Sequence, residues 1–333
     1  MKRRMIISKT PLRITFTGGG TDLPEYYRNF GEGAVISASI NKYIYIVVNK
    51  KFDDRIRVSY SVTEIVDRVD QIRHPTVREA LRLLNIDGGI EIVSISDIPS
   101  TGTGLGSSST FLVGLLHALH AYSGEYVSQR ELAEEAVKIE REILREPGGK
   151  QDQYMAAYGG IQFLKFLPDE NVVVRPVIIP EEARERLWRS LFLMYTGIER
   201  RSQDIHREQS SKVSENVDSY REMVRITEEL YKRLSRGEVD SLGESLHRNW
   251  MLKKTLAGSI SSGWIDELYE RAMSNGGARG GGKLIGAGGG EDSCYSMPPD
   301  VDRRNFVSKF PELREEPFAF DYQGGSQIIF VGD

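Results

Sequence analysis

The stretch from Pro99 to Thr110, PSTGTGLGSSST, has three glycines, four serines and no charged residue. Composition alone suits a flexible linker. The flanking segments predict otherwise, because GIEIVSISDI (89–98) has the apolar pattern of a strand and FLVGLLHALH (111–120) that of a buried helix. A glycine-rich turn between a strand and a helix presents unpaired backbone N–H groups over the helix N-terminus. The stretch therefore predicts an anion-binding loop.

This loop matches neither of two widespread phosphate-binding motifs. A Walker A loop needs Gly-Lys followed by Ser or Thr, and no such sequence follows Gly106. The glycine spacing of the present loop, Gly102-x-Gly104-x-Gly106, also differs from GxGxxG. Its three consecutive serines fall where N-cap and first-turn hydroxyl groups would lie. They could simply cap the helix, or one of them could ligate a metal ion beside bound phosphate.

The chain has 333 residues and a formal net charge of −4, which suits two domains and lacks the basic excess of nucleic-acid-binding proteins. The single cysteine, Cys294, allows no intrachain disulfide and suits a reducing compartment. The basic start MKRRMIISKT has an apolar run too short for a signal peptide. No run approaches the roughly 20 apolar residues of a membrane span. We therefore expect a cytoplasmic protein that binds neither nucleic acid nor membrane.

Apolar periodicity predicts the organisation of the chain. Residues 1–98 read mostly as strands, for example at Leu12, Ile14 and Phe16, with one short helix over 75–84. A capping box, Ser128-x-x-Glu131, predicts the start of a helix over 128–144.

The second half of the chain is less regular. Segments 159–166 and 187–197 read as strands entering a second region, and the charged segment 199–274 as two or three solvated helices. A glycine-rich segment (276–290) and a final strand (327–331) follow. We place the domains at 1–170 and 171–333.

A first cluster of chemically informative residues lies in PLRITFTGGGTDLPEYY (11–27). The glycines Gly18–Gly20 permit positive φ angles and close approach of a ligand to the backbone. Arg13 and Asp22 place opposite charges near one spot. Taken alone, GGTD favours a simpler interpretation, which is a hairpin turn with an exposed aspartate.

Glu140 lies on the apolar side of the predicted helix over 128–144. At about 100° per residue, the apolar residues cover an arc of about 160°, and Glu140 falls near its middle. A buried carboxylate is costly unless it is paired or binds a metal. Glu140 is therefore either a metal ligand or one half of a buried ion pair with an arginine or lysine.

Two further clusters follow. Asp152, in PGGKQDQYMAAYGG (147–160), comes after a glycine turn and could act as a general base, although such an aspartate is more often a turn residue. In GGARGGGKLIGAGGGEDSCYS (276–296), Leu284 stands where a Walker A motif needs Ser or Thr, so we reject that motif. GAGGG (286–290) would let the backbone pass close to a ligand or another loop.

Together, the order and spacing of these clusters resemble the GHMP kinases, the family of galactokinase, homoserine kinase, mevalonate kinase and phosphomevalonate kinase. That family has a substrate motif, a central phosphate loop and a C-terminal glycine-rich motif, which here read PLRITFTGGGTD, PSTGTGLGSSST and KLIGAGGG. The resemblance covers essentially the whole chain. It implies an α+β, two-domain fold, with an N-terminal α/β domain like the second domain of ribosomal protein S5 and a C-terminal ferredoxin-like α+β domain.

The resemblance also implies roles for individual residues. Asp152 would take the proton from the acceptor hydroxyl with the help of Arg13, while Ser108 and Glu140 would hold Mg²⁺. The ATP phosphates would be bound by the loop residues Gly104, Leu105, Gly106, Ser107, Ser108 and Ser109. The sugar would be bound by Gly19, Gly20, Thr21 and Asp22. The third glycine motif comprises Gly286, Ala287 and Gly288.

Within the family, the motifs look most like those of sugar-1-kinases, in particular kinases of heptose 7-phosphate. The open alternatives are a sugar-1-kinase for fucose, galactose or a uronic acid, and a non-catalytic relative that binds sugar or nucleotide. The implied partners are ATP and a sugar or sugar phosphate, and a homodimer is left open. Candidate cations for a substrate phosphate are Lys9, Arg28, Arg200 and Arg201.

The chain departs from the family after the third glycine motif. There the family continues into an apolar strand, whereas Gly290 is followed by EDSCYS. We expect this segment not to form a buried central strand. Either a local frameshift in the gene or genuine divergence would explain it.

Overall fold

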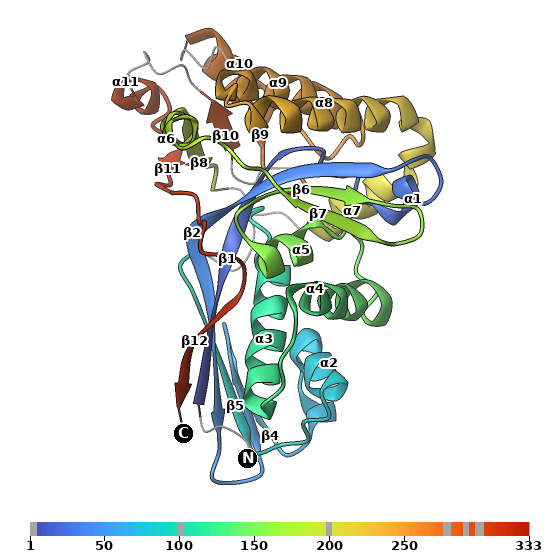
Figure 1. Ribbon diagram of the computed structural model, residues 1–333, viewed down its shortest axis with the longest axis vertical. Helices are drawn as coiled ribbons and strands as arrows, with labels where there is room; N and C mark the ends of the chain where they lie inside the picture. The colour runs from blue at the N-terminus through green and yellow to red at the C-terminus, as the bar shows by residue number, and fades with distance from the viewer. Residues whose placement is uncertain are drawn as a thin grey trace.

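A computed structural model describes residues 5–98, 103–197, 202–275, 281–288, 293–296 and 303–332. Its strands form an eight-stranded and a four-stranded sheet, with helices packed against both (Figure 1). No helix in these ranges is long and apolar enough to cross a bilayer.

The large sheet has the order β12-β1-β2-β5-β3-β4, with β6 paired to β2 and β7 paired to β6. All its pairs are antiparallel except β3 with β5. The strands are β1 (Met5–Thr17), β2 (Gly33–Lys50), β3 (Ile56–Ser59), β4 (Thr63–Val66), β5 (Ile90–Ser96), β6 (Ile161–Phe166), β7 (Val172–Pro176) and β12 (Gln327–Gly332). The strands predicted within residues 1–98 are confirmed, and so is the last strand, which returns from the far end of the chain to pair with β1.

Helices cover one face of this sheet (Figure 1). The central one is α3 (Ser107–Ser123), which packs on β1 and β2 and buries most of its side chains, as predicted. Beside it lie α2 (Pro75–Leu83), α4 (Gln129–Val137) and α5 (Gln151–Tyr158), with the short 3₁₀ turn η1 (Val69–Gln71) next to α2, whereas α1 (Pro24–Tyr27) lies away from them (Figure 1). Because α3 begins directly after the glycine-rich loop, that loop lies at the N-terminus of a largely buried helix.

The helix predicted over 128–144 changes type midway. Ser128 caps α4 with the predicted capping box, but Lys138–Ile143 (η2) form a π-helical turn instead of continuing the α-helix. The wider turn breaks the 100° spacing, so Ile143 is 43% exposed although the periodicity placed it on the buried side. Glu140 lies within this turn and is 2% exposed, as predicted. A π-helical turn of this kind is often found at functional sites.

Two predictions about the entry into the second half were wrong. Segment 159–166 does form a strand, but β6 pairs with β2 in the large sheet and does not begin a second region. Segment 187–197 is a strand only from β8 (Leu191–Tyr195), because its first residues end the helix α6 (Glu181–Arg189). Glutamates in the first turn of α6 and arginines in its last turn complement the helix dipole, which favours the helix there.

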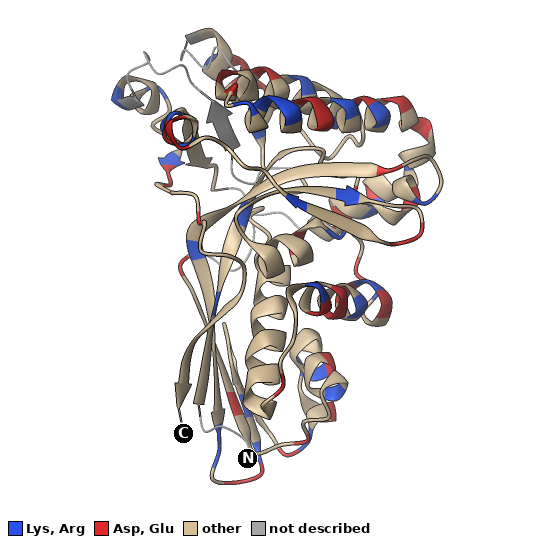
Figure 2. Cartoon of the chain, in the orientation of Figure 1, with Lys and Arg blue, Asp and Glu red and all other residues tan. Residues whose placement is uncertain are grey.

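The charged segment forms four main helices in the described ranges, more than predicted: α7 (Ser202–Ser211), α8 (Val217–Ser235), α9 (Leu242–Lys253) and α10 (Gly263–Asn275). Short 3₁₀ turns, η3 (Val213–Glu215) and η4 (Val239–Ser241), connect them. Charged residues of α8 and α9 gather on their outer surface (Figure 2). Their other faces are buried, including Tyr220 and Met223 of α8 and Trp250 of α9, so these helices are not simply solvated.

The small sheet has the order β11-β8-β10-β9, with β9 (Gly281–Leu284), β10 (Ser293–Ser296) and β11 (Arg314–Glu315), and α11 (Arg303–Ser308) near it in sequence. Contrary to our expectation for the segment after Gly290, its residues Ser293–Ser296 take a central position, because β10 pairs with both β8 and β9. Hydrogen bonding of the backbone along both edges is enough to hold so short a strand in place. The residue types Tyr295 and Cys294 are compatible with a strand. The division at 1–170 and 171–333 stays a prediction.

Candidate active site

Arg13 and Asp152 form a bidentate ion pair at the centre of the molecule. Arg13 lies on β1 and donates from Nε and Nη2 to the two carboxylate oxygens of Asp152, at 2.7 Å each. Asp152 stands in the first turn of α5. The remaining Nη1 of Arg13 donates to the carbonyl of Gly104, and its backbone N–H to Leu105 at 3.1 Å. Arg13 therefore joins the candidate base to the glycine-rich loop.

Asp22 is buried beside this pair. Its carboxylate accepts backbone N–H groups from Gly20 at 2.9 Å and from Gln151 at 3.1 Å. Burial raises the pKa of Asp22; the two backbone donors oppose the rise, and the negative charge of Asp152 adds to it. The alternative of a hairpin turn with an exposed aspartate was wrong, since Asp22 is 2% exposed. Arg13 and Asp22, which were expected near one spot, are connected indirectly: Asp22 accepts the backbone N–H of Gln151, and Arg13 pairs with the next residue, Asp152.

The phosphate loop separates its three serines. Gly106, with φ of 79°, is the N-cap of α3, so the serines lie in the first turn. Ser109 is buried and donates to Glu140 at 2.8 Å, whereas Ser108 is exposed. Ser108 and Glu140 nevertheless line the same cavity. The structure thus places Glu140 in contact with Ser109 and on the lining of the same cavity as Ser108.

Glu140 has a mixed environment. It accepts hydrogen bonds from Ser109 and from the side-chain amide of Gln153, and Nη2 of Arg141 lies 3.7 Å away. Arg141 is mainly engaged elsewhere, because it donates to the backbone carbonyls of residues 146, 147 and 149. Burial raises the pKa of Glu140, and the charge of Arg141 only partly opposes this. The ion-pair alternative is therefore present but weak.

The oxygen atoms around Glu140 suit a hard cation. Oε1 of Gln153 is buried with no hydrogen-bond partner, close to the carboxylate of Glu140 that its own amide contacts. No group of three His, Cys, Asp or Glu side chains that could hold a metal occurs in the described ranges. One carboxylate with hydroxyl groups matches Mg²⁺, which usually keeps waters and binds substrate phosphates as further ligands.

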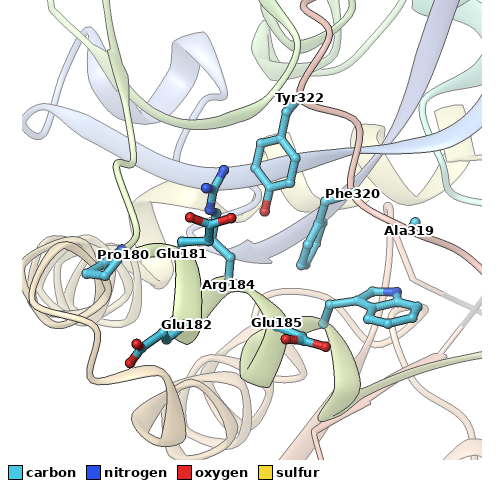
Figure 3. Close-up of a pocket in the computed structure, with 9 residues that line it drawn as sticks. Pro180, Glu181, Glu182, Arg184, Glu185, Ala319, Phe320 and Tyr322 are labelled. Carbon is cyan, nitrogen blue, oxygen red and sulfur yellow. The ribbon is translucent and has the colours of Figure 1, made fainter.

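A cavity of about 540 Å³ opens beside Ser107 and Ser108. One wall is aromatic, with His74 stacked on Phe111 at 5.2 Å between ring centroids. The other contains Glu140 and Gln203. A different cavity, of about 810 Å³, lies between α6 and the segment 319–322 (Figure 3). It is lined by none of the predicted site residues and is therefore not the candidate site.

The third glycine motif is held by α9. Gly286, Ala287 and Gly288 follow β9, and the ammonium group of Lys253 donates to the carbonyl of Gly286. From the same helix, Asn249 accepts the backbone N–H of Gly18 at 2.8 Å. Sequence analysis missed both side chains, because α9 was predicted to be solvated. Gly289 and Gly290 fall outside the described residues.

Sequence analysis also missed the polar side chains of α7 that reach the site, although the segment was predicted to be helical. Gln203 lines the cavity beside the serines, and Gln209 donates to the hydroxyl of Tyr220 at 3.1 Å and lies against Gly20. Between them is His206. Polar residues at spacings of three along a helix were the available signal. Of the candidate cations, Arg28 pairs with Glu170 and Lys9 lies over the ring of Tyr43, while Arg200 and Arg201 fall outside the described residues.

The glycines of the substrate motif are not equivalent. Gly18 has φ of +83°, and a Cβ atom there would lie 1.8 Å from the carbonyl oxygen of Ala34. Gly19 needs no such conformation, and its Cβ atom would meet its nearest neighbour, Thr15, at 3.5 Å. The fold therefore requires glycine at 18 but not at 19.

We expect Gly18→Ala to lower the free energy of unfolding by about 2–4 kcal/mol, because it adds strain and overlap in a packed region. Gly19→Ala should change it by less than about 1 kcal/mol. Urea unfolding measures both, with Gly263→Ala as control, since a Cβ atom there has open space. Equal losses at 18 and 19 would contradict this assignment.

Comparison with known proteins identifies the class. The model of the GHMP kinases N terminal domain matches residues 73–160, which include the phosphate loop, Glu140 and Asp152. The chain is 30% identical over 349 residues to the D-glycero-alpha-D-manno-heptose 7-phosphate kinase of Campylobacter jejuni subsp. jejuni serotype O:2, covering 96% of this chain and 98% of that protein. The chain therefore belongs to the GHMP kinase family and is a kinase.

Solved structures agree with this assignment. A D-glycero-D-manno-heptose 1-phosphate kinase from Bacteroides thetaiotaomicron matches with a TM-score of 0.81 at 23% identity, over 98% of this chain and 100% of that one. Lactococcus lactis galactokinase complexed with galactose matches with a TM-score of 0.77 at 17% identity, over 97% and 95%. The predicted two-domain α+β fold of the GHMP kinases is confirmed.

Proposed function

We propose that this kinase transfers the γ-phosphoryl group of ATP to the anomeric hydroxyl of D-glycero-D-manno-heptose 7-phosphate. The product would be the 1,7-bisphosphate, a precursor of nucleotide-activated heptose. The observation that carries the proposal is the bidentate pair of Arg13 and Asp152, held against the phosphate loop by the contacts of Arg13 with Gly104 and Leu105. The substrate is taken from the named relative, which covers nearly the whole chain.

Proton removal from the acceptor is assigned to Asp152. Its carboxylate is fixed in orientation by two hydrogen bonds from Arg13, and its side chain remains 23% exposed, so an acceptor can reach it. The proton of the C1 hydroxyl passes to Asp152 as the hydroxyl oxygen bonds to the γ-phosphorus and the bond to the β-phosphate oxygen breaks. Arg13 offsets the charge that develops, and catalysis comes mainly from positioning and electrostatics.

ATP binding is assigned to the loop and the cavity beside it. Backbone N–H groups of Gly104–Ser109 at the N-terminus of α3 would bind the phosphates, and the wall of His74 and Phe111 suits a planar base. Mg²⁺ would be held by Ser108 and Glu140, and would supply neutralisation of phosphate charge.

The sugar is assigned to Gly19, Gly20 and Asp22. Asp22 offers carboxylate oxygens to sugar hydroxyls, although both already accept a backbone N–H. Thr21 was predicted with this group. Its hydroxyl both donates to and accepts from the backbone of Ala34, which gives it the role of fixing the loop.

A coupled ADP-release assay over free sugars and sugar phosphates tests the substrate. We expect kcat/KM with heptose 7-phosphate to exceed that with galactose, fucose or a uronic acid by at least about tenfold, since an unpaired phosphate site costs more than 1.4 kcal/mol. Turnover with one of the free sugars and none with the heptose phosphate would replace our substrate by the alternative. If none of the sugars or sugar phosphates in the panel supported ADP release, the proposal would be contradicted altogether.

A further inference from the structure

His206 is a polar side chain near the site that no role described above uses. It lies on α7, between Gln203 and Gln209. The residue is half-buried, and Nδ1 of its ring is buried with no hydrogen-bond partner among the described residues. Buried polar atoms are normally satisfied, so a buried imidazole nitrogen without a partner, on a helix whose neighbouring side chains reach the site, indicates a bound group as partner.

The charges that act on His206 come from four separate elements. They are Arg141 in η2, Lys253 on α9, Asp152 on α5 and Arg13 on β1. His206, on a helix of the C-terminal half, therefore lies within electrostatic range of the candidate base and its arginine. None of these groups hydrogen-bonds to the ring in the described structure.

This surrounding keeps the imidazole neutral. The pKa of His206 is lowered to about 4, mainly by burial, with the charges of Arg141 and Lys253 also lowering it and that of Asp152 opposing them. A neutral imidazole has one N–H donor and one acceptor nitrogen. That pair matches a hydroxyl group, which also donates and accepts, whereas a phosphate oxygen only accepts.

The neighbours on α7 indicate which ligand is within reach. Gln203, one turn before His206, lines the cavity assigned to ATP, whereas Gln209, one turn after it, lies against Gly20 of the substrate motif. His206 thus lies on α7 between residues that reach these two regions, within electrostatic range of the residue that would deprotonate the acceptor. We propose that His206 binds the acceptor sugar by a hydrogen bond to one of its hydroxyl groups. This proposal rests on the function proposed above only in needing a hydroxylated acceptor beside Asp152.

Three variants test the role of the ring: His206→Leu, which removes both nitrogens, and His206→Asn and His206→Gln, which restore one polar position each. The full chain is assayed with ATP and the acceptor that the wild type turns over best. We expect His206→Leu to raise the acceptor KM about tenfold, as loss of one buried hydrogen bond allows, with the ATP KM within twofold. Asn or Gln should recover most of the loss.

His117→Leu is the matched control. His117 is also largely buried with a pKa of about 4, but it has a partner, the hydroxyl of Ser326 at 3.1 Å, and lies on α3. We expect this variant to leave the acceptor KM unchanged, whatever it does to thermal stability. Between pH 5.5 and 8, the acceptor KM of the wild type and that of His206→Leu should change with pH in parallel, because His206 stays neutral there.

The proposal is overturned if His206→Leu leaves the acceptor KM unchanged, if it raises the ATP KM instead, or if the polar variants are no better than leucine. A failure of the proposed substrate is seen separately, in the wild type, as turnover of another sugar. Should the wild type turn over no sugar, stabilisation against heat by galactose or heptose 7-phosphate replaces KM. Equal stabilisation of wild type and His206→Leu would then overturn the proposal, and a smaller shift in His206→Leu would support it.

Discussion

Asp152→Asn is expected to lower kcat by about 10²–10⁴-fold, the range that a positioned general base contributes. The amide keeps the size of the side chain and can still accept one hydrogen bond from Arg13, so the site should remain assembled. What is lost is the carboxylate that takes the acceptor proton. ATP affinity should therefore stay within about threefold of the wild type, measured by titration with a fluorescent nucleotide, while ADP release shows the loss of turnover.

Asp218→Asn is a suitable control for this change. Asp218 is 99% exposed on α8 and, among the described residues, forms an ion pair with Arg221 alone, 3.3 Å away. It should retain wild-type kcat and thermal stability. Near-normal turnover in Asp152→Asn would assign the base elsewhere. A loss of ATP affinity equal to the loss of kcat would instead indicate that the variant has disrupted the loop through Arg13.

Local patterns in the sequence predicted most of the elements around this site. Alternating apolar residues such as Leu12 and Ile14 place one face of β1 in the core, and that requirement is local to the strand. The capping box at Ser128 and the glycine-rich start of α3 are likewise decided within a few residues. Arg13, Glu140 and Asp152 could be selected because each is a charge beside buried or glycine-rich sequence.

Features decided by packing between distant segments could not be predicted. The π-helical turn at 138–143 satisfies contacts of Glu140 with Ser109 and Gln153, which lie on other helices. The spacing of residues along one helix gives no information about these contacts with other helices. In the same way, the choice of Ser109 over Ser108 as the serine that contacts Glu140 depends on how α3 meets η2, and a shift of one residue turns a helix by about 100°.

The second half of the chain was the harder part for a related reason. Its helices carry so many charged residues on one face that their composition does not reveal the buried face. In α9, that buried face includes Asn249, Trp250 and Lys253. Asn249 reaches the N-terminal half at Gly18, and Lys253 reaches the third glycine motif at Gly286. β10 shows the converse, since a strand of low hydrophobicity is held centrally by its pairing with two neighbours.

Glu140→Gln is expected to separate metal binding from stability. The glutamine has nearly the same shape and can still accept hydrogen bonds from Ser109 and Gln153. Because burial raises the pKa of Glu140, the carboxylate is held at a cost that a neutral amide does not have. In the absence of metal, the variant should therefore be at least as stable as the wild type in urea unfolding.

The same change removes the only carboxylate assigned to Mg²⁺. Loss of charge neutralisation at the phosphates, worth several kcal/mol, should lower kcat/KM for MgATP by at least about 100-fold. Mg²⁺ with ATP should stabilise the wild type against urea and the variant much less, since ligands stabilise a fold by binding to it. Glu134→Gln, on the exposed side of α4, is the control and should behave as the wild type. If Glu140→Gln lost stability without metal and kept its activity, Glu140 would be a structural partner of Arg141 and not a metal ligand.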